Sequence, residues 1–285
     1  MSILVTGGTG KIGQFLLETL AAKKVSATVL TRDPAKVVTN AHIKAVKGDI
    51  SDAASFALAV RGHERLFLLT NRQDLEVGLA KAAKDAGVKH IVRISCWLAN
   101  AGHDQGSIFQ AHGRVEVELE NLGVAVTTLR LADFMQNLLG SAASIKHGVF
   151  HHNLTPTTRV ASIDALDIAK SAAAVLTSPI EQHAGLAYTL TGPEAITKDE
   201  LAKHLSSVAG KEVKAIQVSD VAYAQALASF GIPARFAFLL ANLGQHYNLS
   251  LQQPSGFVVH NVEYLTGEKP RTWTQFLEEN KKAFQ

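Results

Sequence analysis

A glycine-rich turn near the N-terminus constrains the fold more than any other feature. The apolar run Ile3–Thr6 leads directly into the segment GGTGKIG, after which apolar residues recur at helical spacing. A strand, a glycine turn and a helix in this order form an anion site, because backbone N–H groups of the turn and of the helix N-terminus point at the ligand. A glycine turn without a ligand is the alternative interpretation. The turn residues predicted to bind the phosphates of a dinucleotide are Gly7, Thr9, Gly10, Lys11, Ile12 and Gly13.

Strand-like and helix-like runs alternate over the first 130 residues. Strands are predicted at 25–31, 43–46, 65–70, 90–95 and 124–131, and helices at 53–60, 75–86 and 110–121. Continuous apolar strands alternating with helices are typical of a parallel sheet covered on both faces. The predicted fold is therefore a doubly wound α/β domain, which binds ligands beyond the carboxyl ends of its strands. Residues just after the strands, among them Leu69, Thr70, Asn71 and Ser95, are predicted to line the cofactor.

The pattern becomes mostly helical in the second half of the chain. We predict a nucleotide-binding domain over residues 1–147, to which segments 158–178 and 186–192 return. Residues 148–285 are expected to form a smaller substrate-binding portion. Within it, Thr197 and Glu200 match the capping box that opens a helix.

Composition and charge exclude several classes of protein. Hydrophobic residues make up 47% and charged residues 19% of the chain, as expected for a globular protein. The net charge of +3 is spread without a basic stripe, which argues against a nucleic-acid partner. The single cysteine, Cys96, permits no intramolecular disulfide and no CxxC metal framework, and a structural thiol is expected. No run approaches the ~20 apolar residues of a membrane span. We therefore expect a cytoplasmic protein without a metal, as a monomer or homodimer.

Basic residues after the second predicted strand indicate which dinucleotide binds. NAD sites place an acidic residue there to accept hydrogen bonds from the ribose, and it would repel a 2′-phosphate. Here Arg32 comes first, and Lys36 follows four residues later. Both suit a phosphate, so we predict NADP(H). Asp33 precedes a proline and is expected to open the turn, although a solvated pair of Arg32 with Asp33 is the alternative. Asp49 is predicted to receive the adenine amino group, or alternatively to act as a loop or cap aspartate.

The proton relay of ordinary carbonyl reductases is missing. Short-chain dehydrogenases of that type use a Tyr and a Lys four residues later to protonate the developing alkoxide. None of the four tyrosines, Tyr188, Tyr223, Tyr247 and Tyr264, is followed by Lys at that spacing.

A histidine stands where that lysine is expected. His112 and Glu116 lie four residues apart on one helical face, where the carboxylate would raise the pKa of the histidine and orient its ring. We predict that His112 binds the nicotinamide ribose or donates a proton. The alternative is an ordinary ion pair on a helix surface.

Several segments together resemble the NmrA-like atypical short-chain dehydrogenases. They are GGTGKIG, TRDPAK, AAKDAGVKHIVRIS, HGRVEVELENLGVAVTTLR, LADFMQN and LTGEKPRTWTQFLEEN. The resemblance covers essentially the whole chain and implies a Rossmann domain with NADP(H) at the sheet edge and a small C-terminal domain. It also implies that residues 69–71 lie along the nicotinamide ribose and that residues 132–137 lie over the nicotinamide and substrate. Phe134 would then form a pocket wall, and a core phenylalanine is the alternative.

The resemblance extends to the histidine. NADPH-sensing regulators of this family carry a lysine at the position of His112, whereas its quinone reductases and triphenylmethane-dye reductases resemble this chain in having histidine. Conjugated acceptors such as quinones spread the charge that hydride brings, so that solvent can protonate them later. We therefore predict an NADPH-dependent reductase that transfers hydride directly to a quinone-like or other conjugated small molecule. A non-catalytic NADP(H)-sensing protein is the alternative.

Overall fold

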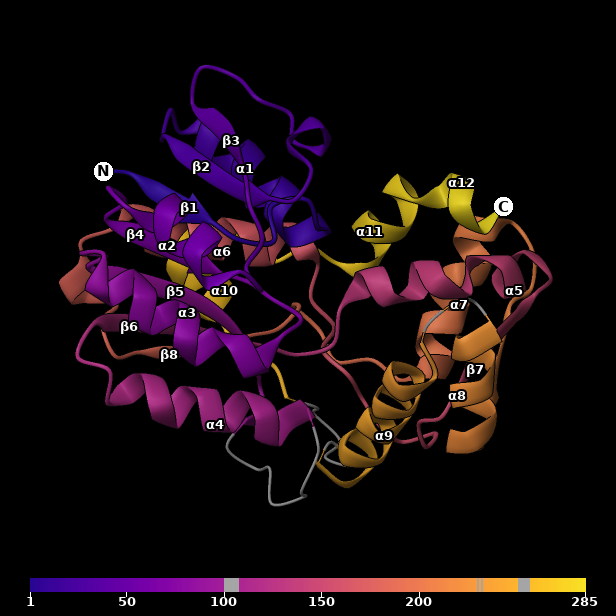
Figure 1. Ribbon diagram of the computed structural model, residues 1–285. Coiled ribbons are helices and arrows are strands. Elements are labelled where there is room, and N and C mark those ends of the chain that lie inside the picture. Colours follow the sequence, from indigo (N-terminus) through magenta and orange to yellow (C-terminus); the bar gives the residue numbers. More distant parts are fainter. Residues whose placement is uncertain (100–107, 230, 232, 251–256) are drawn as a thin grey trace. The chain divides into compact units, whose positions relative to one another are not determined.

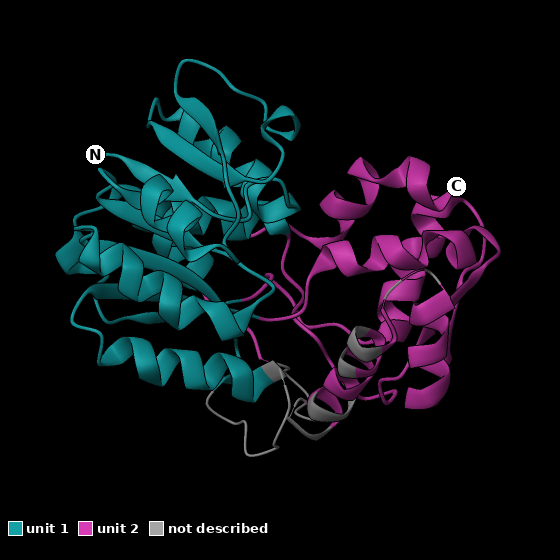
Figure 2. Ribbon diagram, in the orientation of Figure 1, with its two compact units in different colours: residues 1–131, 165–190, 261–268 teal, residues 132–164, 191–260, 269–285 magenta. Residues whose placement is uncertain are grey.

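The chain forms two compact units (Figure 2). The computed structural model describes residues 1–99, 108–229, 231, 233–250 and 257–285. Unit 1 comprises Met1–Leu131, Ala165–Leu190 and Asn261–Glu268, and unit 2 comprises Ala132–Asp164, Thr191–His260 and Lys269–Gln285. Residues 132–147 thus belong to unit 2, and a C-terminal segment that we had not expected returns to unit 1. The chain changes unit directly after the sixth strand of the sheet ends at Leu131.

Unit 1 is built on a parallel sheet of seven strands (Figure 1). They are β1 (Ile3–Val5), β2 (Ala27–Thr31), β3 (Ile43–Lys47), β4 (Arg65–Leu68), β5 (His90–Cys96), β6 (Ala125–Leu131) and β8 (Ala187–Leu190). Their order is β3-β2-β1-β4-β5-β6-β8, and every neighbouring pair is parallel. The order reverses between β1 and β4, which is the point where doubly wound sheets bind their ligands. The predicted doubly wound fold is confirmed.

Helices cover both faces of this sheet (Figure 1). One core cluster joins the strands to α2 (Ala53–Val60), α3 (Gln73–Asp85) and α4 (Ile108–Glu120), and includes Leu66, Leu79 and Leu119. The other helices of unit 1 are α1 (Lys11–Ala22), α6 (Ala165–Thr177) and α10 (Asn261–Thr266), of which α6 packs against both α1 and α10. Every helix of the α1–α4 series follows a strand, so its N-terminus lies at the carboxyl edge of the sheet.

Unit 2 has a core of its own. Its elements are η3 (Met135–Ser141), α5 (Ala142–Lys146), β7 (Val149–His152), α7 (Lys198–Ala209), β9 (Lys214–Gln217), α8 (Asp220–Ser229), α9 (Ala234–Ser250), α11 (Trp273–Glu279) and α12 (Lys281–Phe284). The predicted capping box is present, since Thr197 Oγ1 accepts the N–H of Glu200 and the Glu200 carboxylate accepts the N–H of Thr197. The core includes Trp273, Phe276 and Leu205.

The short strand β9 of unit 2 has no clear signal in the sequence. Strand β9 pairs with β7 in parallel and has only four residues. None of them is buried, and the alternation of apolar and polar residues that marks a half-buried strand is missing. Around Val160 the chain forms a single bridge to Ile196 and no strand. Within the described ranges, no helix has both the length and the apolar character needed to cross a bilayer.

Candidate cofactor and reductase site

The glycine turn that joins β1 to α1 is too closely packed for larger residues at Gly7 and Gly13. Gly7 has a φ of +69°, in the left-handed region that favours glycine. The N–H of Gly10 donates to the carbonyl of Gly7 at 3.0 Å, which closes the turn. A Cβ on Gly13 would overlap the carbonyl oxygen of Gly7 and lie 2.6 Å from the Cα of Gly8. The first and third glycines of the motif are therefore required by the turn itself.

The middle glycine leaves the helix N-terminus open. Gly10 is the N-cap of α1 and has no side-chain cap, and the first turn of α1 carries no acidic residue. A Cβ on Gly10 would meet nothing nearer than the Gly7 carbonyl oxygen at 3.4 Å, so internal crowding does not explain the glycine. An uncapped helix end with positive partial charge fits an anionic group such as a pyrophosphate. Thr9 and Lys11 are exposed beside it, and Ile12 is half-buried.

The end of β2 exposes Arg32 and gives Asp33 a local role. Asp33 is the N-cap of the short helix η1 (Pro34–Lys36), and its Oδ1 accepts the N–H of Ala35 at 3.2 Å. The expectation that Asp33 opens the turn is confirmed. Lys36 Nζ lies 3.8 Å from Asp33 Oδ2, so this carboxylate already balances part of the lysine charge. Arg32 is thus the better placed of the two basic side chains to meet a phosphate.

Asp49 follows β3 and forms a turn. Its Oδ1 accepts the N–H of Ser51 at 2.9 Å, as the loop interpretation predicts. The cap of α2 is Asp52, which accepts from Ala54 and Ser55. Asp49 is half-buried, and contact with adenine stays a prediction.

The segment after β4 is fixed against β1. Thr6 Oγ1 accepts the N–H of Leu69 at 3.0 Å. Thr70 Oγ1 donates to Glu76 Oε1 at 2.8 Å and accepts the N–H of Arg72, whereas Asn71 is exposed. The predicted cofactor residues after β4 therefore connect the glycine turn to the start of α3.

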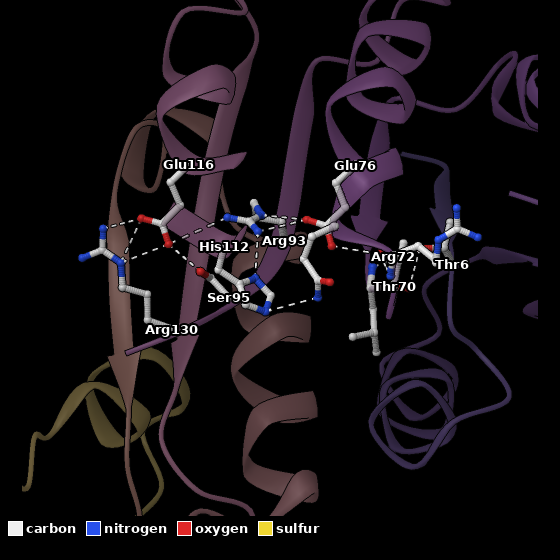
Figure 3. Close-up of polar contacts among 11 residues, drawn as sticks. Thr6, Thr70, Arg72, Glu76, Arg93, Ser95, His112, Glu116 and Arg130 are labelled. Atoms are coloured by element: carbon white, nitrogen blue, oxygen red, sulfur yellow. Dashed lines mark hydrogen bonds and ion pairs between the residues drawn. The ribbon is translucent and has the colours of Figure 1, made fainter. Parts of the chain in front are cut away.

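A buried network of charges continues from this segment across β5 to β6 (Figure 3). Arg93 on β5 donates from Nε and Nη2 to Glu76 Oε2 at 3.2 and 2.9 Å, and neither side chain is more than 1% exposed. Glu116 on α4 accepts from Ser95 Oγ and from Arg130 Nε. Sequence reasoning missed Glu76, Arg93 and Arg130. The available signal was an arginine inside the apolar strand HIVRIS, since buried charges require partners.

His112 lies inside this network. Its Nδ1 is 3.2 Å from Arg93 Nη2, and its Nε2 is 3.3 Å from the side-chain nitrogen of Gln73. The ring is only 8% exposed, so the surface ion pair considered as an alternative is wrong. The expected rise in the pKa of His112 is also wrong. Burial and the positive Arg93 lower its pKa to about 4, whereas the negative Glu116 acts in the opposite direction. The Glu116 carboxylate is itself engaged by Ser95 and Arg130.

The remaining predicted residues have ordinary environments. Phe134 is half-buried and bridges to Ile163 within unit 2, next to the fully buried Met135. Burial raises the pKa of the Cys96 thiol to about 12, with the negative Glu116 adding to the shift, as suits a structural thiol. Within the residues that the structure describes, no group of three or more His, Cys, Asp or Glu side chains has the arrangement of a metal site.

We expect the protein to lose stability in mild acid, because it contains three buried histidines with lowered pKa values. The pKa values of His90, His112 and His152 are each lowered to about 4, mainly by burial. In the unfolded chain they take up a proton near pH 6.5, whereas the folded protein keeps them neutral until about pH 4. The unfolded state therefore gains on the order of 2 kcal/mol per histidine by about pH 5.

Urea unfolding at about pH 7.5 and about pH 5 measures this loss. The variant His152→Gln is expected to show a smaller pH dependence, whereas His260→Gln, which replaces an exposed side chain, is the matched control. Equal stability of the wild-type protein at the two pH values would contradict the expectation.

The pattern of the NmrA-like family matches residues 1–277. The chain belongs to this family. An NAD(P)H azoreductase of Xenophilus azovorans is 32% identical over 289 residues, covering 99% of both chains. A (4-alkanoyl-5-oxo-2,5-dihydrofuran-3-yl)methyl phosphate reductase of Streptomyces griseus is 31% identical over 286 residues, again covering 99% of both. The structure of the Escherichia coli NADPH-dependent quinone oxidoreductase QOR2 with NADPH superposes with a TM-score of 0.84 at 29% identity, covering 98% of this chain and 99% of that one.

These similarities confirm the family resemblance inferred from the sequence. They extend over nearly the full length of the relatives, so both units of this chain have counterparts in them. The roles of the individual site residues stay predictions.

Proposed function

We propose that the protein is an NADPH-dependent reductase that delivers hydride directly to a quinone-like or other conjugated small molecule. The observation that carries this proposal is the uncapped N-terminus of α1 behind a glycine turn, which Thr6, Leu69 and Thr70 connect to the buried network around His112. The relatives support the substrate class, since their names specify an azo compound, an oxo-dihydrofuran and a quinone. All three kinds of molecule are conjugated electrophiles.

Residues that follow successive strands at the carboxyl edge of the sheet are proposed to contact different parts of NADP(H). The turn from Gly7 to Gly13 would hold the pyrophosphate, and Arg32, with Lys36, the 2′-phosphate. Asp49 is proposed for the adenine, and residues 69–71 for the nicotinamide ribose. Ser95, whose hydroxyl donates to Glu116, is proposed to lie on the nicotinamide side. When bound, the reduced nicotinamide supplies a hydride.

The chain's own residues then position the reactants and shield the site. The Tyr–Lys pair is absent from the sequence, and the neutral His112 has no charge to deliver as an imidazolium acid. Conjugated acceptors fit such a site, because they delocalise the negative charge and take a proton from water afterwards. Positioning of donor and acceptor then accounts for most of the catalysis.

Steady-state oxidation of NADPH with a panel of acceptors tests the function. We expect turnover with quinones and azo or triphenylmethane dyes without added flavin, and none with a simple ketone. NADPH deuterated at C4 is expected to slow the reaction and to transfer its deuterium to a carbon acceptor. An absence of turnover with every acceptor, together with tighter binding of oxidised than reduced cofactor, would support the alternative of a cofactor sensor.

Arg32 is expected to decide the choice of nucleotide. The Arg32→Ala substitution removes a charged hydrogen bond to the 2′-phosphate, worth about 1.5–3 kcal/mol, so the Kd for NADPH rises about 10- to 100-fold. The Kd for NADH is expected to change little, because NADH lacks that phosphate. Titration of both cofactors measures the two constants. Arg61→Ala, at the end of α2, is the control, and equal losses for NADPH and NADH would refute the assignment.

A further inference from the structure

Arg93 is held from two sides inside unit 1. It lies on β5 between apolar neighbours, and its guanidinium donates from Nε and Nη2 to Glu76 Oε2. Its Nη1 lies 3.8 Å from Glu116 Oε1. These two carboxylates, on α3 and α4, leave Nη2 pointing also at His112 Nδ1, 3.2 Å away (Figure 3). The approach of Arg93 to the histidine is therefore set by the fold.

This contact determines which nitrogen of His112 carries the hydrogen. A guanidinium is always charged and only donates hydrogen bonds, so the Nδ1 that faces it must accept. In the neutral ring the hydrogen is then on Nε2. The side chain of Gln73 lies 3.3 Å from this Nε2, and because its amide orientation is assigned from the network, its oxygen is the atom that meets the N–H. Nε2 is thus a hydrogen-bond donor.

We propose that Arg93 is a positioning residue that holds His112 as a neutral ring with its hydrogen on Nε2. His112 then donates its one N–H, which faces Gln73 in this structure, to a ligand oxygen that takes the place of Gln73, and it never serves as a proton-releasing imidazolium. The state of the ring follows from contacts within unit 1, whereas the nature of the ligand oxygen rests on the proposed function.

The charges around the ring support this assignment. Among the described residues, the charged groups of the network that includes the ring are Arg93 on β5, Glu76 on α3, Glu116 on α4 and Arg130 on β6, and Cys96 on β5 interacts with Arg93 and Glu116. Each carboxylate has its own arginine, Glu76 with Arg93 and Glu116 with Arg130. Neither of these two carboxylates is thus left to pair with an imidazolium at His112. Burial, reinforced by Arg93, lowers the pKa of His112 to about 4.

A neutral donor suits the reduction of a conjugated molecule. An uncharged acceptor such as a quinone takes up hydride, with its electron pair, and becomes an anion, while the cofactor is oxidised. The Nε2–H group stabilises negative charge on an oxygen without transferring its own proton. The anion then takes one proton from water, which balances the reaction.

Nitrogen NMR of the full-length, ¹⁵N-histidine-labelled protein tests the assignment without any substrate. The His112 signals are identified by their loss in His112→Gln. We expect the Nε2–H tautomer and no titration between about pH 5 and about pH 8, the range in which free histidine changes charge. A hydrogen on Nδ1, or a titration midpoint inside this range, would overturn the proposal. Because this measurement needs no turnover, a failed reductase assay would leave its outcome intact.

Variants show whether Arg93 is responsible. The paired substitution Glu76→Gln with Arg93→Gln removes both charges together, so that neither is left alone in the interior. His112 is expected to lose its fixed tautomer in this variant and to show signals of the Nδ1–H form as well, provided circular dichroism shows the native fold, whereas burial still lowers the pKa of the ring. A ring that keeps its hydrogen on Nε2 alone would contradict the role of Arg93.

Activity measurements separate a donor from an acid, even if the paired variant does not fold. Loss of one neutral hydrogen bond in His112→Ala is expected to reduce kcat/KM about 10-fold. His112→Gln is expected to recover most of this, because its amide nitrogen replaces Nε2–H as a donor, and its pH profile should match that of the wild type. Two results together would refute the donor role. They are an equal loss of kcat/KM in the two variants and a wild-type rate that falls with rising pH around neutrality, as it does when an acid catalyst loses its proton.

Discussion

The Arg93→Met substitution is expected to lower the free energy of unfolding by about 3–5 kcal/mol. Methionine fills most of the volume of the arginine stem but leaves Glu76 without its ionic partner, and Glu76 is only 1% exposed. Burial already raises the pKa of Glu76 against the effect of Arg93, so the loss of that arginine leaves burial largely unopposed. Urea unfolding followed by circular dichroism measures the change.

The exposed ion pair of Arg72 with Asp74 provides a matched control. Arg72 donates to the Asp74 carboxylate at 2.8 and 2.6 Å, but the two side chains are 54% and 61% exposed. Water solvates these charges in the unfolded and folded protein alike, so Arg72→Met is expected to cost less than about 1 kcal/mol. If the two substitutions lowered the free energy of unfolding by similar amounts, burial of the Arg93–Glu76 pair would not increase the cost of losing the arginine. Replacing Glu76 and Arg93 together with apolar residues is expected to restore most of the stability.

The Gly13→Val substitution is expected to weaken NADPH binding by about 100-fold or more, because small displacements of positioning groups have effects of that size. The added side chain would overlap backbone atoms of Gly7 and Gly8, which cannot turn aside as a side chain would. Helix α1 must therefore move away from the turn, and its N–H groups no longer converge on the phosphate. Overpacking of this kind also costs about 1–3 kcal/mol of stability. Fluorescence titration with NADPH measures the binding.

Gly78 in α3 is the control for a glycine without such neighbours. A Cβ there would meet no atom within 4 Å, and its φ is not in the left-handed region. Gly78→Ala is expected to leave NADPH binding unchanged and to add about 0.5–1 kcal/mol of stability, since alanine favours the helix. Unchanged NADPH binding in Gly13→Val would show that the close approach of α1 to the turn is not needed for the cofactor.

Local sequence patterns predicted the parts of the structure that depend on local interactions. The spacing of apolar residues placed strands β1–β6 and helices α1–α4 of unit 1, and the capping box at Thr197 marked the start of α7. Asp33 and Asp49 form the turns that their short side chains favour. Each of these features is determined by residues a few positions apart, which the sequence displays directly.

The state of His112 depended on residues that are distant in the sequence. Its spacing from Glu116 indicated an ion pair, but strands β5 and β6 bring Arg93 and Arg130 to the same place. Arg130 and Ser95 take the carboxylate, and Arg93 faces the histidine. The glycine turn, the alternation of strands and helices and the absence of a Tyr–Lys pair can all be recognised from the residues alone. The charge and tautomer of His112 follow from the folded molecule, because electrostatic energy depends on distances in space and on burial, neither of which is a property of the local sequence.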